Sequence, residues 1–402
     1  MSSRFNIVNK PKKIETEEEE TELEEEQQNE QQKAAKKRMT KYMLFIMVGF
    51  VGLILIIFLL SLLIDKKYTY EEIEVVLKDA AVEYFVDHKD SLPTAEGDIV
   101  QVDVASLSVE EKMKPLSEYL EEGVTCSGNV QVQKVGEEYV YTPYLDCGES
   151  YKTIELYNKI IAEEPVVTTG YGLYSINGFY VYRGEEVNNY VQLDKQLWRI
   201  VKITPANNIV LIKAEIDGTS EAWDDRYNKY TTYNDGMNSY NTSRIKETLS
   251  TMYSNTKEDD FEPPLFSDND RAKIIPYDLC IGKRSSNQVS KNGEIECSEI
   301  VENQKIGLLP LYDYINASID EDCSTAESLS CQNYNYLITE RSWWTQTPDS
   351  KSTYSVYSIE ENGKIESNST ASYNYIRPVI YLNSKVMYKE GKGTAEKPYI
   401  LK

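Results

Sequence analysis

The sequence predicts an α+β protein with one transmembrane helix, a small module of helix and sheet beside it, and a larger domain of antiparallel strands with long loops. Residues 43–64 form an apolar stretch without a charge. Beyond it, short segments alternate apolar and polar side chains, and turn-forming pairs such as Asn177–Gly178 separate them. These two patterns define the predicted elements in chain order.

The apolar stretch contains 22 residues. At about 1.5 Å of rise per residue it is long enough to cross a hydrocarbon core of roughly 30 Å. Five basic residues precede it and two follow it, and such an excess predicts a cytoplasmic N-terminus: Lys33, Lys36, Lys37, Arg38 and Lys41 against Lys66 and Lys67. We therefore predict an uncleaved signal-anchor in a single-pass protein of the cell membrane, with residues 42–64 in contact with membrane lipid and the following residues extracellular.

The composition of residues 1–41 predicts a disordered cytoplasmic tail. Ten glutamates between Glu15 and Glu30 precede a basic end, and such a segment cannot bury enough apolar surface to fold alone. A weak coiled coil is the alternative, although no heptad seam of apolar residues supports it.

A membrane-proximal module is expected over residues 65–150. Residues 69–93 predict a helix with one apolar face, ended by Pro93. Residues 130–135 and 139–144 alternate as two strands, and a tight turn at Gly136–Glu137 pairs position 135 with position 138. The same antiparallel register sets Cys126 opposite Cys147, which predicts a disulfide between them.

The four remaining cysteines pair most simply by nearness in the sequence, as Cys280–Cys297 and Cys323–Cys331. An even number of cysteines, all beyond the apolar stretch, is typical of an oxidising compartment. No CxxC motif occurs, so neither a zinc site nor thiol redox chemistry is predicted.

Residues 151–165 predict a helical linker, and residues 166–402 one α+β domain. Helical spacing appears at 242–253 and a short helix or turn at 306–318. The predicted strands of this domain are 173–176, 179–183, 198–203, 209–216, 342–347, 354–359, 364–369 and 376–382.

The composition limits the classes of partner and of catalytic group that we expect. Residues 1–67 contain as many basic as acidic side chains, so the following part carries the whole net charge of −23, which argues against nucleic acid as a partner. His88 is the single histidine and lies outside the large domain, which excludes a histidine general base there. Asp224–Asp225 and Asp268–Asp270 offer oxygen ligands for calcium, but they lack an EF-hand loop. We expect solvated charges there, and predict no catalytic residue, metal site or cofactor.

Aromatic side chains give the best indication of a binding site. Trp343 and Trp344 are neighbours on a predicted strand and therefore point to opposite faces. One is expected in the core, and the other on the surface beside Tyr354 and Tyr357, where it would stack on a glycan or contact a protein. The alternative is that both tryptophans are packed inside.

Two resemblances add to this picture. The apolar stretch with its helix, the segment LPTAEGDIVQVDVASL (92–107) and the late disulfide resemble type IV pilins and pseudopilins over about residues 42–150. The pilin maturation pattern is absent before Met43.

The large domain is similar to uncharacterised surface proteins of low-GC Gram-positive bacteria, and distantly to the formylglycine-generating-enzyme and C-type-lectin-like folds. The resemblance implies a C-type-lectin-like antiparallel domain, and it carries no activity with it. The segments that carry it are NGFYVYRGEEVNNYVQLDKQLWRIVKI (177–203), DLCIGKR (278–284), IGLLPLYDYINAS (306–318), CQNYNYL (331–337), WWTQTP (343–348), IRPVIYL (376–382) and GTAEKPYIL (393–401).

The functional hypothesis is a non-enzymatic, membrane-anchored surface protein for adhesion or ligand binding, with an extracellular glycan or protein as its ligand. A structural component of a pilus or of the cell envelope is one alternative. A wall-acting hydrolase that uses a pair of carboxylates is the other.

Overall fold

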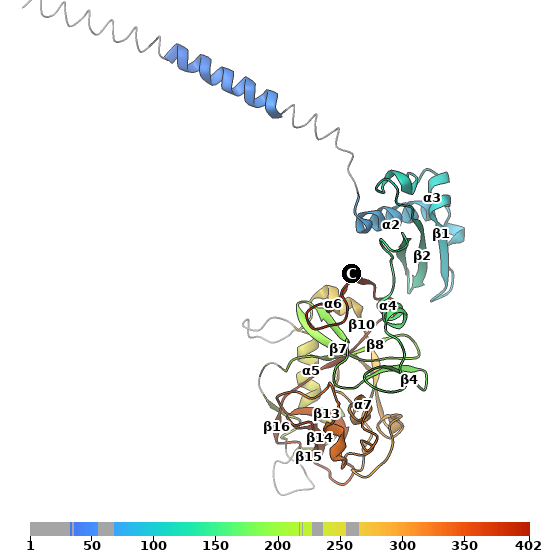
Figure 1. Cartoon of the computed structure of the whole chain (residues 1–402), viewed down its shortest axis with the longest axis vertical. Coiled ribbons are helices and arrows are strands. Elements are labelled where there is room, and N and C mark those ends of the chain that lie inside the picture. Colours follow the sequence, from blue (N-terminus) through green and yellow to red (C-terminus); the bar gives the residue numbers. More distant parts are fainter. Residues whose placement is uncertain are drawn as a thin grey trace, which may run out of the picture.

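The computed structural model describes residues 33, 36–54, 68–216, 218, 220–226, 236–254 and 265–402. Two separate hydrophobic cores form beyond residue 67, one between Ile73 and Cys147 and one between Leu156 and Tyr399. Figure 1 shows the smaller module in blue and teal, and the larger domain in green to red.

Residues 36–54 are helical, yet within the described residues no helix is both long enough and apolar enough to cross a membrane. The described part of the apolar stretch, residues 43–54, rises about 18 Å, against the roughly 30 Å of a hydrocarbon core. This finding contradicts the transmembrane helix expected over 42–64, and with it the membrane, single-pass and signal-anchor assignments. Residues 55–64 and most of the expected tail lie outside the described residues.

The smaller module packs one long helix on a three-stranded sheet. Helix α2 (Tyr70–Asp87) begins at a capping box in which Thr69 and Glu72 exchange hydrogen bonds, and it ends before the expected Pro93. Its buried face, which includes Ile73, Leu77 and Phe85, meets the sheet of order β1-β2-β3. The other elements are β1 (Ile99–Asp103), β2 (Ser127–Val135), β3 (Glu138–Asp146), α3 (Val104–Val109) and the 3₁₀ turns η1 (Lys89–Ser91) and η2 (Leu116–Glu118).

The register of the β2–β3 hairpin confirms the sequence prediction. Val135 pairs with Glu138, and the ladder runs without a shift to Ser127 and Asp146. Cys126 and Cys147 follow directly and form a disulfide. The pairs Cys280–Cys297 and Cys323–Cys331 form as well, so all three predicted disulfides are confirmed.

The expected linker contains helix α4 (Leu156–Glu163), and the larger domain is built on a nine-stranded sheet. Its first hairpin turns at Asn177 and Gly178, both at positive φ (52° and 82°), as an Asn-Gly turn requires. Among the described strands of this sheet, β6 and β19 pair in parallel and the other pairs are antiparallel. Its strands are β4 (Gly172–Ile176), β5 (Phe179–Arg183), β6 (Tyr190–Leu193), β7 (Gln196–Ile203), β8 (Ile209–Lys213), β10 (Ile274–Ile275), β17 (Val379–Leu382), β18 (Tyr388–Glu390) and β19 (Tyr399–Leu401).

Smaller sheets and short helices complete the domain. A three-stranded sheet of order β13-β14-β15 matters most for the site described below. The elements are β13 (Trp343–Pro348), β14 (Ser355–Ile359), β15 (Ile365–Ser369), β11 (Tyr277–Cys280) with β12 (Ile300–Gln304), β9 (Glu221–Ala222) with β16 (Tyr373–Asn374), α5 (Arg244–Ser254), α6 (Asp268–Lys273), α7 (Leu311–Ala317), and the 3₁₀ turns η3 (Tyr240–Thr242), η4 (Glu296–Ser298) and η5 (Leu329–Gln332). The predicted α+β character is confirmed.

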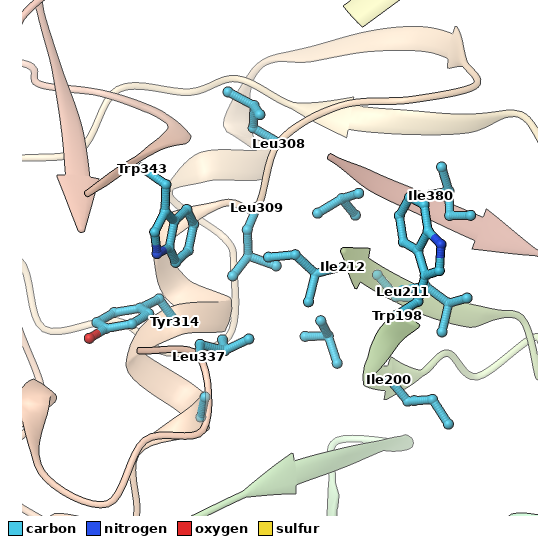
Figure 2. Packing of buried hydrophobic residues seen from close by; sticks show 14 of the residues in the cluster. Trp198, Ile200, Leu211, Ile212, Leu308, Leu309, Tyr314, Leu337, Trp343 and Ile380 are labelled. Atoms are coloured by element: carbon cyan, nitrogen blue, oxygen red, sulfur yellow. The ribbon is translucent and has the colours of Figure 1, made fainter. Parts of the chain in front are cut away.

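The large core joins the main sheet to the β13–β15 sheet. Figure 2 shows Leu309 between Trp343 on one side and Ile212 on the other, and Leu337 belongs to the same core. The ring of Tyr314, from α7, meets Trp343 edge-on with 6.0 Å between ring centroids. Because aliphatic side chains from several elements interdigitate here, the two sheets share one hydrophobic core.

The two modules meet at a polar junction. The Glu74 carboxylate on α2 accepts hydrogen bonds from Thr153 and from Tyr151, whose hydroxyl is 2.8 Å away. Lys402 Nζ lies 2.7 Å and 2.8 Å from the two oxygens of Glu74. We call Glu74, Tyr151, Thr153 and Lys402 the junction network. Figure 1 shows the chain end labelled C beside this junction.

Candidate functional site: a polar pocket between two disulfide-closed loops

The predicted aromatic platform does not form. Trp343 and Trp344 are both fully buried, and Tyr357 is 2 % exposed. Tyr354 alone reaches the surface, at 37 % exposure. The expectation of an exposed tryptophan is therefore wrong, and the alternative of two packed rings is correct.

Long-range contacts explain why both faces of β13 are covered. Trp343 packs against Tyr314 on one face, and the Arg377 guanidinium lies 5.2 Å from its ring centroid. On the other face, Trp344 Nε1 donates to the carbonyl of Glu221, in β9, at 2.8 Å. Segments more than 100 residues away in the sequence thus bury the second tryptophan.

A pocket of about 340 Å³ opens near the β14–β15 hairpin. Of the predicted site residues it includes Tyr357 only. Two separate loops and the β14–β15 hairpin supply its lining: Ser286, Ala326, Glu327, Ser328, Leu329, Tyr357, Lys364, Ile365, Glu366 and Ser367. A volume of this size lies at the lower end of the roughly 300–1,000 Å³ typical of small-molecule sites.

The β14–β15 hairpin supplies one side of the pocket. Lys364 Nζ pairs with Glu366 Oε1 at 2.6 Å, and Ser367 Oγ donates to Asp349 Oδ2 at 2.7 Å. Tyr357 crosses to the neighbouring loop, where its hydroxyl donates to the Arg284 carbonyl at 3.2 Å. Burial raises the pKa of Tyr357 well above its usual range, so the phenol stays neutral and keeps this hydrogen bond.

The loop closed by Cys323–Cys331 supplies the second side. It contains the lining residues Ala326 to Leu329, and both of its cysteines are fully buried. Ser328 Oγ accepts from the backbone N–H of Thr325 at 3.2 Å, which folds the loop back on itself. A short disulfide loop with internal hydrogen bonds holds its side chains in place before any ligand arrives.

The loop closed by Cys280–Cys297 supplies the third side through Ser286. Arg284 fixes this loop from inside, since its Nη1 pairs with Glu296 Oε1 at 2.9 Å and its Nη2 donates to two loop carbonyls. Its backbone is bonded to β13 and to Ser350 beyond it. Arg284 and Glu296 are fully buried, and burial raises the pKa of Glu296 while Arg284 opposes that shift.

The two disulfide loops touch each other at the pocket. The backbone N–H of Glu327 donates to the Ser286 carbonyl at 3.2 Å, and the Ser286 hydroxyl also bonds to the Glu327 carboxylate. Lys351 Nζ lies 2.8 Å from Ser286 Oγ. The pocket therefore presents hydroxyls, carboxylates and the ammonium group of Lys364 around a few apolar contacts from Ala326, Leu329 and Ile365.

The acidic pairs noted in the sequence are bound by protein groups. Asp224 accepts from Arg226 Nε at 2.7 Å and from the backbone N–H of Met237, and Asp225 pairs with Arg244. Within the described ranges, no group of three or more metal-ligating side chains could hold an ion. The members of the second pair, Asp268 and Asp270, bond to Arg271 and to Ser267.

Sequence reasoning missed the pocket because its lining comes from segments 286, 326–329 and 364–367. No motif connects these segments along the chain. The one available signal was the pair of short cysteine-closed loops, each of which has three serines between its cysteines. Such loops are restrained by their disulfides and carry polar side chains to the surface, which is a common way to build a site.

A comparison with known protein families gives one match. Residues 206–384 are similar to a domain of unknown function, DUF6273. The matched range is less than half of the chain, and it includes every residue that lines the pocket. Neither a curated protein nor a solved structure matches the chain. The pilin-like and lectin-like resemblances are therefore predictions that no match tests.

Proposed function

We propose that the large domain binds a small, hydroxyl-rich ligand, such as a saccharide unit, in the pocket between its two disulfide loops, and does not convert it. The observation that carries this proposal is the lining: three serine hydroxyls, two carboxylates and a lysine surround a restrained cavity. Hydroxyl groups of a sugar pair well with such donors and acceptors, and Leu329 and Ile365 offer apolar contacts to its C–H faces.

The charges of the pocket favour binding over catalysis. A carboxylate pair that cleaves glycosides needs one carboxylic acid kept protonated by a dry environment. Here the side chains of Glu327 and Glu366 are 60 % and 41 % exposed, and each lies within 4 Å of a lysine nitrogen. Groups of this kind act as hydrogen-bond partners for a ligand.

The three disulfides support a working environment that is oxidising. Under this proposal the protein is a ligand-binding or adhesive component of such a compartment. The disulfides serve the function directly, because two of them close the loops that line the pocket.

Calorimetric titration of the full chain with a panel of neutral mono- and disaccharides tests the proposal. We expect at least one sugar to bind, and Glu366→Gln or Ser367→Ala to weaken its affinity about fivefold or more, since the first change replaces a charged acceptor by a weaker neutral one and the second removes a hydroxyl. Glu302→Gln, on the exposed strand β12, is the matched control and should leave the affinity unchanged.

Two results would count against the proposal. One is a sugar affinity that is the same in Glu366→Gln, Ser367→Ala and Glu302→Gln, which would place the ligand elsewhere. The other is release of reducing ends from a bound disaccharide, which would make the domain an enzyme.

A further inference from the structure

A second exposed feature shares no residue with the lining of the pocket. Tyr171 and Tyr334 are 39 % and 49 % exposed, and their ring centroids are 6.1 Å apart with planes tilted by 42°. Glu185 and Glu186 are exposed nearby. We propose that these four residues form a binding site for an alkylammonium cation, a site that does not depend on the function proposed for the pocket.

Backbone contacts bring the three segments together. Gly184 pairs with Asn335 as a β-bridge, and the Tyr336 N–H donates to the Gly184 carbonyl at 2.9 Å. The Tyr171 ring lies directly on Gly184, where any Cβ would collide with it. Gly184 has a φ of 109°, so glycine is required there for both reasons. The ring of Tyr171 is thereby fixed next to the two glutamates.

Tyr334 is held in an uncommon conformation. Its φ is 49°, in the left-handed region that a bulky aromatic residue seldom adopts. The flanking Asn335 side chain donates to the carbonyls of Tyr314 and Cys331 and so anchors the turn on the disulfide loop. The backbone therefore holds a half-exposed ring beside Tyr171. Burial of this ring does not explain why the chain adopts the uncommon conformation.

The two glutamates are available to a ligand. Among the described residues, neither Glu185 nor Glu186 forms an ion pair. The neighbouring cation, Arg183, donates to the carbonyls of Asn316 and Ser318 at 2.8 Å and 2.7 Å and lies over the Tyr174 ring. Glu185 directly follows Gly184, against which the Tyr171 ring lies, and partial desolvation, followed by the charge of Glu185, raises the pKa of Tyr171.

An alkylammonium group matches this combination. A cation is attracted to an aromatic face when it lies within about 6 Å of the ring centroid, and two rings 6.1 Å apart allow one cation to meet both. The methyl groups of such a cation contact the rings, and the carboxylates supply the opposite charge. A neutral sugar would stack on the rings and donate hydroxyl groups to the carboxylates, but it would lack the attraction between a positive charge and the two glutamates.

Saturation-transfer NMR on the full chain tests the site with two probes of the same shape. Choline carries the positive charge, and 3,3-dimethylbutan-1-ol is its neutral carbon analogue. We expect choline to bind in the millimolar range and the neutral alcohol to bind at least threefold more weakly. Binding of choline should also weaken as salt is added, because the carboxylates are exposed.

Variants locate the site. Tyr334→Leu should weaken choline binding about threefold or more, Tyr334→Phe should retain it, and the double change Glu185→Gln, Glu186→Gln should weaken it and reduce its salt dependence. Tyr373→Leu, at a tyrosine 66 % exposed on β16, is the matched control. Thermal unfolding of each variant shows whether the fold is intact. Equal binding of both probes, or unchanged choline affinity in a folded Tyr334→Leu protein, would overturn the proposal.

Discussion

The side chains of Trp343 and Trp344 illustrate how a residue's environment depends on distant parts of the chain. Alternation along a strand correctly places the two rings on opposite faces. It does not reveal that β9 covers one face while α7 and Arg377 cover the other. In a short window of sequence, a strand covered on both faces looks the same as a strand covered on one face. The difference is hidden because the covering segments are far away in the sequence.

Both tryptophans should therefore contribute to stability. We expect Trp343→Ala and Trp344→Ala each to lower the free energy of unfolding by about 3–5 kcal/mol, since each leaves a large cavity in a packed core. Urea unfolding followed by circular dichroism measures the effect. Tyr354→Ala, which truncates the one exposed member of the predicted set, should cost less than about 1 kcal/mol and serves as the comparison. A free energy of unfolding equal to that of the wild type in either tryptophan variant would contradict the burial described above.

Arg377 shows a related difference at the residue scale. A buried arginine usually pairs with a carboxylate inside its domain. The Arg377 guanidinium instead donates to the backbone carbonyls of Lys213 and Leu337 at 2.8 Å and 2.6 Å. Burial, and then the charge of Arg199, lower its pKa to about 9. Carbonyl partners carry no sequence signal, so a partner of this kind cannot be inferred from residue types.

Among the elements, hairpins were the most predictable. The pairing of β2 with β3 and the disulfide beside it can be predicted from the turn at Gly136–Glu137 and from the alternation of side chains along each strand. Once the turn is fixed, it sets the register of the whole hairpin. The pocket is the opposite case. Its sides come from one hairpin and two loops that the sequence places up to about 80 residues apart, and only the fold brings them together.

The short helix α3 provides a test at the scale of one element. Its N-cap residue, Asp103, accepts a hydrogen bond from the backbone N–H of Ser106 at 2.7 Å, and that bond lowers the pKa of Asp103 below its usual value of 3.8. We expect Asp103→Ala to cost about 1 kcal/mol at neutral pH. A carboxylate whose folded pKa is lowered stabilises the fold above its unfolded pKa and loses that effect as the pH falls through the folded value.

The difference between wild type and Asp103→Ala should therefore shrink as the pH falls below about 3.8. Urea unfolding of both proteins at neutral pH and near pH 2 measures it. Asp98→Ala removes an exposed carboxylate from the loop before β1 and should show no such dependence. A cost that is the same at both pH values would show that the cap acts through packing and not through charge.

At the scale of the whole molecule, two cores are joined by few but well-defined contacts. Backbone hydrogen bonds hold the linker to both modules: the Thr153 N–H donates to the Leu145 carbonyl of the smaller module, and the Tyr388 N–H of the larger domain donates to the carbonyl of residue 154. The junction network adds a charged interaction, because Lys402 reaches Glu74 on α2 across the boundary between the modules. The Glu74 carboxylate is almost buried, so it depends on this cation and on two hydroxyl donors.

Removing that cation should separate the unfolding of the two modules. We expect Lys402→Met to lower the stability of the smaller module by about 2 kcal/mol, because a nearly buried carboxylate loses its charged partner. Differential scanning calorimetry should then show the smaller module unfolding at a lower temperature than the larger domain. Lys397→Met, an exposed lysine a few residues away, is the matched control and should leave the calorimetric trace unchanged. If Lys402→Met unfolds with the same trace as this control, the junction network does not couple the modules, and their association must rest on the backbone contacts around residues 153–154.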